Sequence, residues 1–593
     1  MINATWRKRF SILANRLYLY PSPDPMPHTR LFWFAMGLVT LAVAAFSGYF
    51  ILYTIAQHNA FVTNAEDFGI YDQALWSTVH GQVLHQTICN ILSDTNCVTP
   101  NGIMRFAIHF EPILFPLSLF YLLWPDPKIL LVLQTLVVAS GAYPAFWLAR
   151  LRLRSELAGV AIALLYLLYP AQQQAVVFDF HAVTFTAALL LFTLYFMYTR
   201  QTLWLFVFAI LSMACKEEIP AVVIMFGLWS MLFQRRWRSG LALALLGTAW
   251  LVLGLYVIIP HFSPTGRPLL VSRFGHLGGP GQLLLHALLH PVDFLKQYVF
   301  EGSHFAYLHS LFSPAGFIAL PAPLRPLYLV LFAPWVLVLA LPSIAANLLS
   351  SEPGMYTGIF HYNAEIVPVL IFATIEAIVL ILWLVYIIPI WWRRGTLLFF
   401  ARKGVRSPQS TPTAPAASED MASTNAAARP HLFNLPAFLR APLPQRLVPA
   451  CLLTVLLTFV LFNAVKADYS FYGHLPFSSG FQWPSTSAHT ALAQRFIGMI
   501  PPTASVSAQN KLVPHLSHRE KIYLFPYASE SADYIFLDIN GDIYPYPNVS
   551  QYMSDVQKVM ASGNYGVLAA QDGYVLLKRG LPPSRGLPGF QRT

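Results

Sequence analysis

Long apolar runs alternate with short polar segments along most of the chain. A run of about 20 apolar residues crosses the hydrocarbon of a bilayer as one helix. About eleven such spans are expected from this pattern. They are Leu31–Ile55, Ile129–Leu148, Leu157–Tyr169 with its flank, Ala182–Tyr198, Leu203–Cys215, Ile219–Phe233, Leu241–Ile259, Phe305–Leu320, Leu327–Leu349, Glu365–Ile390 and Leu447–Val465. The pattern predicts a polytopic all-α transmembrane protein.

Clusters of Lys and Arg orient these spans, because short cytoplasmic loops carry an excess of basic residues. The clusters are Arg7, Lys8, Arg9, Arg16 and Arg30; Arg150, Arg152 and Arg154; Arg200; Arg235, Arg236 and Arg238; Arg325; and Arg393 and Arg394. Residues 1–30 are therefore expected in the cytoplasm. The first apolar run is far longer than the ~7–15 residues of a signal peptide, which predicts a retained span.

One apolar segment, Pro112–Trp124, is too short to cross the membrane. Its 13 residues make about 20 Å of helix, whereas the hydrocarbon core is about 30 Å thick. The alternation of basic ends is self-consistent only if this segment stays on the outer side. We therefore expect an interfacial or re-entrant helix there.

The chain divides into five regions. After the cytoplasmic N-terminus, residues 31–402 form the transmembrane domain. Residues 403–446 are rich in Ser, Thr, Ala and Pro, which predicts a disordered cytoplasmic linker. A last span follows at 447–466. In residues 467–593, short apolar segments alternate with turn signals and helical stretches, which predicts a small extracytoplasmic α/β domain.

The composition agrees with this class. Hydrophobic residues make up 56% of the chain and charged residues 11%, whereas soluble domains have about 25% charged residues. The net charge of +11 comes from span ends and not from a basic patch interleaved with aromatics, so no nucleic-acid partner is expected. Cys89 and Cys97 fall in the first outer loop and are either bridged or free. Cys215 and Cys451 lie in spans.

The first outer loop carries the leading candidate residues. Glu66 and Asp67 precede a short amphipathic helix, whose apolar side holds Ile70 and Leu75 and whose polar side holds Asp72. Asp67 could simply cap this helix, because a carboxylate there accepts unpaired backbone N–H groups. A catalytic carboxylate at the membrane surface is the alternative, and the two roles are compatible.

Further ionisable residues occur at the end of the first outer loop and in the later outer loops. They are His109 and Glu111; Asp179 and His181; Lys216, Glu217 and Glu218; and His361. Each has an ordinary interpretation: solvated loop residues for His109 and Glu111, a structural ion pair for the Lys216 group, and an interfacial anchor for His361. In an extended segment Asp179 and His181 would share one side, where they could bind a divalent cation such as Mg²⁺ or Mn²⁺ or orient a phosphate.

Taken together, three or four loops on one side carry an acid or a histidine at the membrane boundary. An enzyme that acts on a lipid-linked phosphate needs a base for the acceptor and a cation for the phosphate. Arg267 and Arg273 in the long loop at about 261–304 are candidate phosphate contacts.

Six strings of this sequence resemble a bacterial family of predicted membrane proteins known as domain of unknown function 2079. They are DFGIYDQALW, HFEPIL, LLYPAQQQAVVFDFHAVTF, KEEIPAVV, SVSAQNKLVPHLSHREKIYLFP and YGVLAAQDGYVLLKRG. That family is grouped with the GT-C glycosyltransferases, which take a sugar from a polyprenyl-phosphate carrier on the outer face of the membrane.

The resemblance implies specific roles for several residues. Asp67, with Glu66 beside it, matches the acid of the first outer loop, and Asp179 matches the acid of the next. Pro112–Trp124 matches the interfacial helix. The order Glu66-Asp67 departs from the family's Asp-Glu order, so the base is either Asp67 or Asp72. The resemblance also implies a place in the inner membrane of a bacterial cell.

The function expected from these observations is a GT-C type inverting glycosyltransferase of the cell envelope. It would move a sugar from a polyprenyl-phosphate-linked donor to an acceptor glycan, lipid or protein. Asp179, His181, Lys216 and Glu217 would serve the phosphate or a metal, and Glu66, His109, Glu111 and His361 would support the site. A lipid or polysaccharide-precursor flippase is the alternative, although transporters place ionisable groups mid-span. A receptor that acts through its tail is a third.

Overall fold

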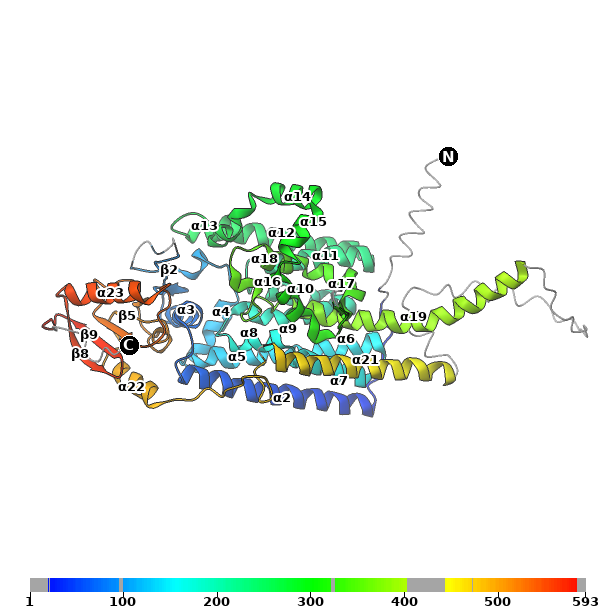
Figure 1. Ribbon diagram of the computed structural model, residues 1–593, viewed down its shortest axis with the longest axis horizontal. Coiled ribbons are helices and arrows are strands. Elements are labelled where there is room, and N and C mark those ends of the chain that lie inside the picture. The colour runs from blue at the N-terminus through cyan, green and yellow to red at the C-terminus, as the bar shows by residue number, and fades with distance from the viewer. Residues whose placement is uncertain are drawn as a thin grey trace, which may run out of the picture.

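The computed structural model describes residues 20, 22–94, 97, 100–321, 326–402, 443–471 and 473–583. It shows an elongated helical bundle with a small α/β domain at one end (Figure 1). The helix α19 (Val367–Arg402) projects from the opposite end. A mostly helical fold with a C-terminal sheet domain agrees with the sequence prediction.

Five helices in the described part of the chain are long and apolar enough to cross a membrane. The first is α2 (Arg30–Asn59), and the second is formed by α5 (Lys128–Ser140) and α6 (Ala142–Leu153) together. The third is Trp237–Phe262, which begins with α12 (Trp237–Val252). The last two are Val367–Val385, the first half of α19, and Val448–Ser470, which belongs to α21 (Leu443–Ser470). Thr29 caps α2 by accepting a hydrogen bond from the Phe32 N–H.

A sixth unit is bent. The helices α7 (Glu156–Leu167) and α8 (Pro170–Val177) pass the same test together, with a 46° bend between them. Pro170 begins α8, and proline breaks the hydrogen-bond ladder of a continuous helix. Shorter apolar helices cover four further expected spans: Ala182–Tyr198, which contains α9 (Thr186–Tyr198); α10 (Thr202–Met213); α11 (Ile219–Gln234); and Pro334–Leu349, which ends in α18 (Leu341–Leu349).

One of these four expected spans and one further expected span are not continuous helices. In place of Phe305–Leu320 the chain forms α16 (Gly302–Phe312), a 3-10 turn and the two-residue strand β3 (Phe317–Ile318). Pro314 and Gly316, with φ at +111°, end the helix. Leu327–Leu349 is likewise divided into a short strand, 3-10 turns and two helices around Pro334 and Pro342. The turn expected at Arg325 lies outside the described residues.

The Pro112–Trp124 segment forms no helix long enough to span a membrane. It contains α4 (Leu114–Ser118) and the 3-10 turn η3 (Leu119–Leu122). Leu122 and Leu123 are exposed, whereas Leu114 and Tyr121 are buried against the rest of the first outer loop. Apolar residues on one side and a packed core on the other are typical of a helix that lies in the membrane interface.

The α/β domain is built on a five-stranded sheet of order β6-β5-β7-β9-β8. The strands are β5 (Val506–Ala508), β6 (Ile522–Leu524), β7 (Tyr534–Asp538), β8 (Tyr565–Gln571) and β9 (Tyr574–Arg579). β5 pairs in parallel with β6 and β7, and β9 pairs antiparallel with β7 and β8. Because side chains alternate along a strand, Ile535 and Leu537 face α23 (Val549–Ala561) while Phe536 faces α22 (Ala488–Ile497).

The first outer loop packs on the α22 side of this sheet. Phe61, Ala65, Ile70 and Ile88 belong to the same buried cluster as the strands. The loop contains a one-turn π-helix at Ala65–Gly69, the helix α3 (Ile70–Val79) and a hairpin of β1 (His85–Gln86) with β2 (Ile103–Met104). Cys89 and Cys97 form a disulfide. The loop and the α/β domain therefore share one hydrophobic core.

The expected domain boundaries fall partly outside the described residues. Residues 1–19 of the N-terminal region, which include Arg7, Lys8, Arg9 and Arg16, are not among the described residues. The same holds for residues 403–442 of the expected linker. The end of that linker differs from the prediction, because α21 already begins at Leu443. The long outer loop contains α14 (Pro280–Leu289) and α15 (Pro291–Tyr298).

The basic side chains collect at the end of the bundle where α2 begins. Arg150 donates to the Pro27 carbonyl, Arg154 to that of Asp24 and Arg200 to that of Tyr20. Asp67 follows the other end of α2, which is 30 residues long, or about 45 Å at 1.5 Å per residue. Acids and basic clusters thus lie at opposite ends of α2, which supports the orientation expected from the positive-inside rule.

We expect the α/β domain to lie outside the cytoplasm. Asn540 is exposed in a turn of that domain, so Asn540→Cys in a Cys451→Ser background reports its side of the membrane. A membrane-impermeant maleimide should label intact cells. Labelling that requires permeabilised cells would reverse the topology. The background protein alone is the control, because Cys215 is buried.

Candidate functional site

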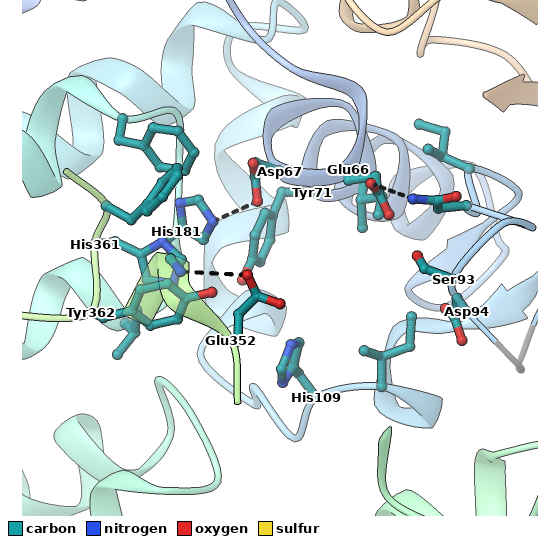
Figure 2. A pocket seen from close by; sticks show the side chains of 18 of the residues that line it. Glu66, Asp67, Tyr71, Ser93, Asp94, His109, His181, Glu352, His361 and Tyr362 are labelled. Carbon is teal, nitrogen blue, oxygen red and sulfur yellow. Dashed lines mark hydrogen bonds and ion pairs between the residues drawn. The ribbon is translucent and has the colours of Figure 1, made fainter. Parts of the chain in front are cut away.

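A cavity of about 360 Å³ opens between the first outer loop, the later outer loops and the α/β domain. Its lining includes Glu66, Asp67, His109, His181, Lys216 and His361 from the set expected in the sequence. Figure 2 shows Asp67 and His181 facing each other, with His361 and Tyr362 on one side of them and Glu66, Ser93 and Asp94 on the other. The structure thus brings together residues from five separate segments.

Asp67 and His181 form the central pair of this cavity. Asp67 Oδ1 lies 3.0 Å from His181 Nε2, and the Asp67 side chain is 30% exposed. The capping role considered for Asp67 is wrong, because Asp67 lies inside the π-helix that begins at Ala65. Its carboxylate turns to the cavity, where it can accept a proton from a hydroxyl group.

A stack of rings holds His181. The His181 and His361 rings are 3.6 Å apart between centroids, and Phe178 stacks on His181 at 5.7 Å. Burial lowers the pKa of His361 well below its usual value, and the positive charges of His181 and Lys216 lower it further. The Nδ1 atoms of both histidines are buried and have no hydrogen-bond partner among the described residues.

Two cations line the same cavity. Lys216 is buried in the turn between α10 and α11, pairs with Glu218 at 2.8 Å and lies 5.5 Å from the Tyr362 ring. Burial lowers the pKa of Lys216, but Glu218 and Glu217 outweigh this effect and raise it, so the ammonium stays charged. Arg273 comes from a 3-10 helix at Leu269–Leu277 and has only a long contact with the Met355 sulfur, at 3.8 Å, among the described residues. Both can balance a phosphate charge.

A set of buried hydrogen bonds next to the cavity involves His109, Glu111 and Glu217. Glu111 accepts from the Tyr71 hydroxyl at 2.5 Å and from Arg105 Nε at 2.8 Å. Glu217 lies 2.8 Å from His109 Nδ1 and accepts from the Phe110 N–H at 3.1 Å. Burial raises the pKa of Glu217. Both buried carboxylates are bonded to neighbouring loop residues and so hold the loops in position.

Glu66 marks the opposite end of the cavity. It accepts hydrogen bonds from Asn90 Nδ2 at 3.1 Å and from the Tyr544 hydroxyl of the α/β domain. Burial raises the pKa of Glu66 to about 7, helped by the charges of Asp67 and Asp94 and opposed by the two hydrogen bonds.

The structure does not bring Asp72 into the cavity. Its carboxylate is fully buried and accepts from Tyr121 at 2.6 Å, from His518 Nε2 at 3.0 Å and from the Ser517 hydroxyl. The polar side of α3 was expected to face water, but the α/β domain covers it. Asp72 therefore joins the domain to the membrane part and is not placed to act as a base.

Asp179 also points away from the cavity lining. It accepts from the Asn64 backbone N–H at 3.0 Å and from Asn64 Nδ2 at 2.7 Å. The prediction that Asp179 and His181 share one side assumed an extended backbone, whereas Asp179 has φ at +50°. Burial, followed by the charge of Asp67, raises the pKa of Asp179 to about 7. Asp179 thus fixes Asn64, three residues before Asp67.

The divalent cation expected at Asp179 and His181 stays a prediction. The group of described His, Cys and acidic side chains with metal-like spacing is Cys89, Asp94 and Cys97, and its cysteines are joined in the disulfide. In the cavity, Asp67 and His181 are at hydrogen-bond distance, so an ion there would replace that hydrogen bond.

A second, more apolar cavity of about 280 Å³ adjoins the first through Arg273, which lines both. Leu251, Leu255, Phe274 and Ala346 supply apolar walls. Burial and the charge of Glu218 raise the pKa of Glu365 in this cavity to about 8. Glu365 is therefore largely uncharged at neutral pH, which suits an apolar ligand.

Sequence reasoning missed several residues of the cavity. Asn90, Arg105, Glu352 and Tyr544 line it, and Asn64 holds Asp179. They sit in polar loops like many others, and Tyr544 is 478 residues from its partner Glu66. The string DIYPYPN around Tyr544 gives no local signal of its role. Arg273 was expected and lines the cavity, whereas Arg267 is exposed outside it.

Comparison with known proteins gives a family and a general likeness. The family described as "Predicted membrane protein (DUF2079)" matches residues 57–401 and 432–576. Two crystal structures of ArnT from Cupriavidus metallidurans are similar at 12% identity and cover 92% of this chain. The one bound to undecaprenyl phosphate has a TM-score of 0.39 over 100% of its own chain, and the apo form 0.40 over 98%. No curated protein matches the chain.

The buried Asp72–His518 pair predicts a pH window for docking of the α/β domain. Burial raises the pKa of Asp72, but His518 and hydrogen bonds outweigh it and lower that pKa. Burial lowers the pKa of His518, but Asp72 outweighs it and raises that pKa. The Asp72 contribution is lost as pH falls through its folded pKa. The His518 contribution is complete below about 6.5 and is lost as pH rises through its folded value.

The stabilisation that this pair gives to docking should therefore be largest between about pH 4 and 6.5. Asp72→Asn should cost about 1–3 kcal/mol, because it weakens buried hydrogen bonds to a charged group. Thermal unfolding and limited proteolysis of the full chain in detergent measure both effects. The double variant Asp72→Asn, His518→Gln is the control, since it should lose the part of the pH dependence that this pair contributes. An unchanged profile in that variant would contradict the assignment.

Proposed function

We propose that this chain, which belongs to the DUF2079 family of predicted membrane proteins, is a glycosyltransferase that uses a polyprenyl-phosphate-linked sugar. The transfer inverts the anomeric carbon. One observation carries the proposal. A base candidate, Asp67, lies between a cationic end and a carboxylate-rich end of one cavity, and the cationic end continues into an apolar cavity.

Asp67 is the general base of this proposal. It takes the proton of an acceptor hydroxyl while the hydroxyl oxygen bonds to the anomeric carbon. The bond from that carbon to the phosphate oxygen breaks, and the electron pair leaves with the polyprenyl phosphate. His181 holds the Asp67 carboxylate in place at 3.0 Å. A positioned base of this kind contributes about 10²–10⁴-fold to the rate.

Lys216 and Arg273 receive the phosphate. Phosphate leaving is easier where preorganised positive groups stabilise the developing charge in a site that excludes water. Arg273 lines both cavities, so a phosphate beside it has room for an apolar chain on one side and for a sugar on the other. This arrangement fits an amphipathic donor better than a free sugar nucleotide.

Removing the carboxylate at position 67 should abolish transfer. Asp67→Asn keeps the shape but cannot accept the proton, so the turnover number should fall about 10²–10⁴-fold. Asp72→Asn should affect stability more than chemistry, and Asp179→Ala should reduce turnover by releasing Asn64. The relative activities of the three variants are measured by the release of sugar from a radiolabelled polyprenyl-phosphate donor, with the protein in lipid nanodiscs. If Asp72→Asn were inactive while Asp67→Asn kept normal transfer, the base would be Asp72.

Removing the cation at position 273 should weaken donor binding. Arg273→Met should raise the donor KM about 10–100-fold, because a charge-assisted hydrogen bond is worth about 1.5–3 kcal/mol. Arg267→Met is the matched control, since Arg267 is exposed in the same long loop and should leave the KM unchanged. Equal effects of the two variants would remove Arg273 from the donor site.

The flippase alternative makes a different prediction for the same variants. A flippase moves the lipid-linked sugar across the bilayer without breaking the bond to phosphate. If protein in liposomes moves the donor between leaflets while the sugar–phosphate bond stays intact, the glycosyltransferase proposal fails. Donor cleavage that depends on Asp67 supports it.

A further inference from the structure

The two ends of the cavity differ in charge. Lys216 and Arg273 lie at the end that adjoins the apolar cavity, with His361, Tyr362 and one carboxylate, Glu352. On the far side of Asp67, Figure 2 shows Glu66, Ser93 and Asp94. The third cation of the lining, Arg105, is bound to Glu111 at 2.8 Å and lies over the Tyr71 ring at 4.4 Å. Arg105 is therefore balanced by a carboxylate, as Lys216 is by Glu218 at 2.8 Å.

The α/β domain completes the carboxylate-rich end. Tyr544 reaches across from that domain and donates its hydroxyl to Glu66. Asn90 Nδ2 lies 3.1 Å from Glu66 Oε2 and 3.5 Å from the Tyr544 hydroxyl. These three side chains form a connected set of hydrogen-bonding groups, with the tyrosine ring beside them in the lining.

The disulfide fixes this end against the domain. Cys89 and Cys97 close the segment that carries Asn90, Ser93 and Asp94. Cys89 is buried with Tyr523 and Tyr527 of the α/β domain, and the Tyr523 hydroxyl donates to the Pro100 carbonyl at 2.9 Å. Because both walls are held together, the end of the cavity is a preformed subsite.

We infer that this end binds the acceptor, that the acceptor is a hydroxyl-rich carbohydrate without anionic groups, and that Tyr544 of the α/β domain takes part in binding it. The inference rests on the proposed glycosyltransferase function and names its second substrate by class. Carboxylate and amide oxygens accept hydrogen bonds from sugar hydroxyls. The Tyr544 ring offers an apolar face with a polar tip, which suits the mixed surface of a sugar.

The same chemistry argues against an anionic acceptor. Glu66, Asp67 and Asp94 would repel a phosphate or a uronic acid, and like charges that are brought together disfavour binding. Burial raises the pKa of Glu66 to about 7, so at neutral pH this carboxyl group also exists in a protonated form. A protonated Glu66 can donate a hydrogen bond to a sugar oxygen and accept one from a sugar hydroxyl. Both kinds of hydrogen bond are available with a neutral sugar.

Two trisaccharides of equal length and linkage test the class of acceptor. The full-length protein in nanodiscs is given donor with maltotriose, which is neutral, or with trigalacturonic acid, which carries three carboxylates. Maltotriose should accelerate donor consumption and the acid should not. An acceleration by the acid alone, by both equally or by neither would overturn the inference.

Variants test the role of Tyr544 in binding the acceptor. Tyr544→Phe and Glu66→Gln should each raise the KM for maltotriose about tenfold, as expected for the loss of about one hydrogen bond, while the KM for donor changes by less than about twofold. Tyr546→Phe is the matched control: Tyr546 lies in the same loop but donates to Asp555 within the domain, so both KM values should stay unchanged. Equal shifts in the two KM values would indicate a merely structural role for Tyr544.

Failure of this inference and failure of the proposed function are distinguishable. Water can replace the acceptor, so slow donor hydrolysis that is lost in Asp67→Asn supports the glycosyltransferase without any trisaccharide. Hydrolysis without acceleration by maltotriose overturns only the acceptor class. Absence of any donor cleavage overturns the proposed function itself. Thermal unfolding of each variant confirms that it is folded.

Discussion

The candidate site depends on one amide side chain, Asn64. Its backbone N–H and Nδ2 donate to Asp179, and its Oδ1 accepts from Asn510 at 3.1 Å and from Lys511 at 2.6 Å. A buried carboxylate needs such donors, because burying it unpaired is costly. One residue thereby joins the first outer loop, the segment after α8 and the α/β domain. Asp67 follows three positions later, in the π-helix that Asn64 precedes.

This junction explains why the membrane part and the α/β domain form one site. The π-helix and α3 contribute to a core shared with the sheet, and Asp72 ties α3 to Ser517 and His518. The polar groups on α3 are satisfied by the domain instead of by water, so separation of the domain would expose both an apolar face and unpaired polar atoms. The domain is therefore structurally continuous with the membrane part and not a separate appendage.

The sequence was sufficient for features that depend on local patterns. The helices α2, α19 and α21 follow from apolar runs, and Pro112–Trp124 follows from its length. The pairing of Asp67 with His181 was not predictable, because it requires the fold to join residues 114 positions apart. Asp72 was misplaced because a helical wheel cannot distinguish water from a covering domain. Asp179 was misplaced because its left-handed backbone has no local sequence signal.

The order of the charged groups along the cavity supports the proposed transfer more strongly than any single residue does. Inversion requires the acceptor oxygen and the leaving phosphate to lie on opposite faces of the anomeric carbon, with the base on the acceptor side. In this chain Lys216 and Arg273 lie at one end together with Glu352, whereas Glu66, Ser93 and Asp94 lie at the other, and Asp67 stands between them. Reversing the two substrates would place a phosphate against Glu66 and Asp94, and a neutral hydroxyl against Lys216. Under the proposed function, this charge pattern favours attack from the α/β domain toward the membrane.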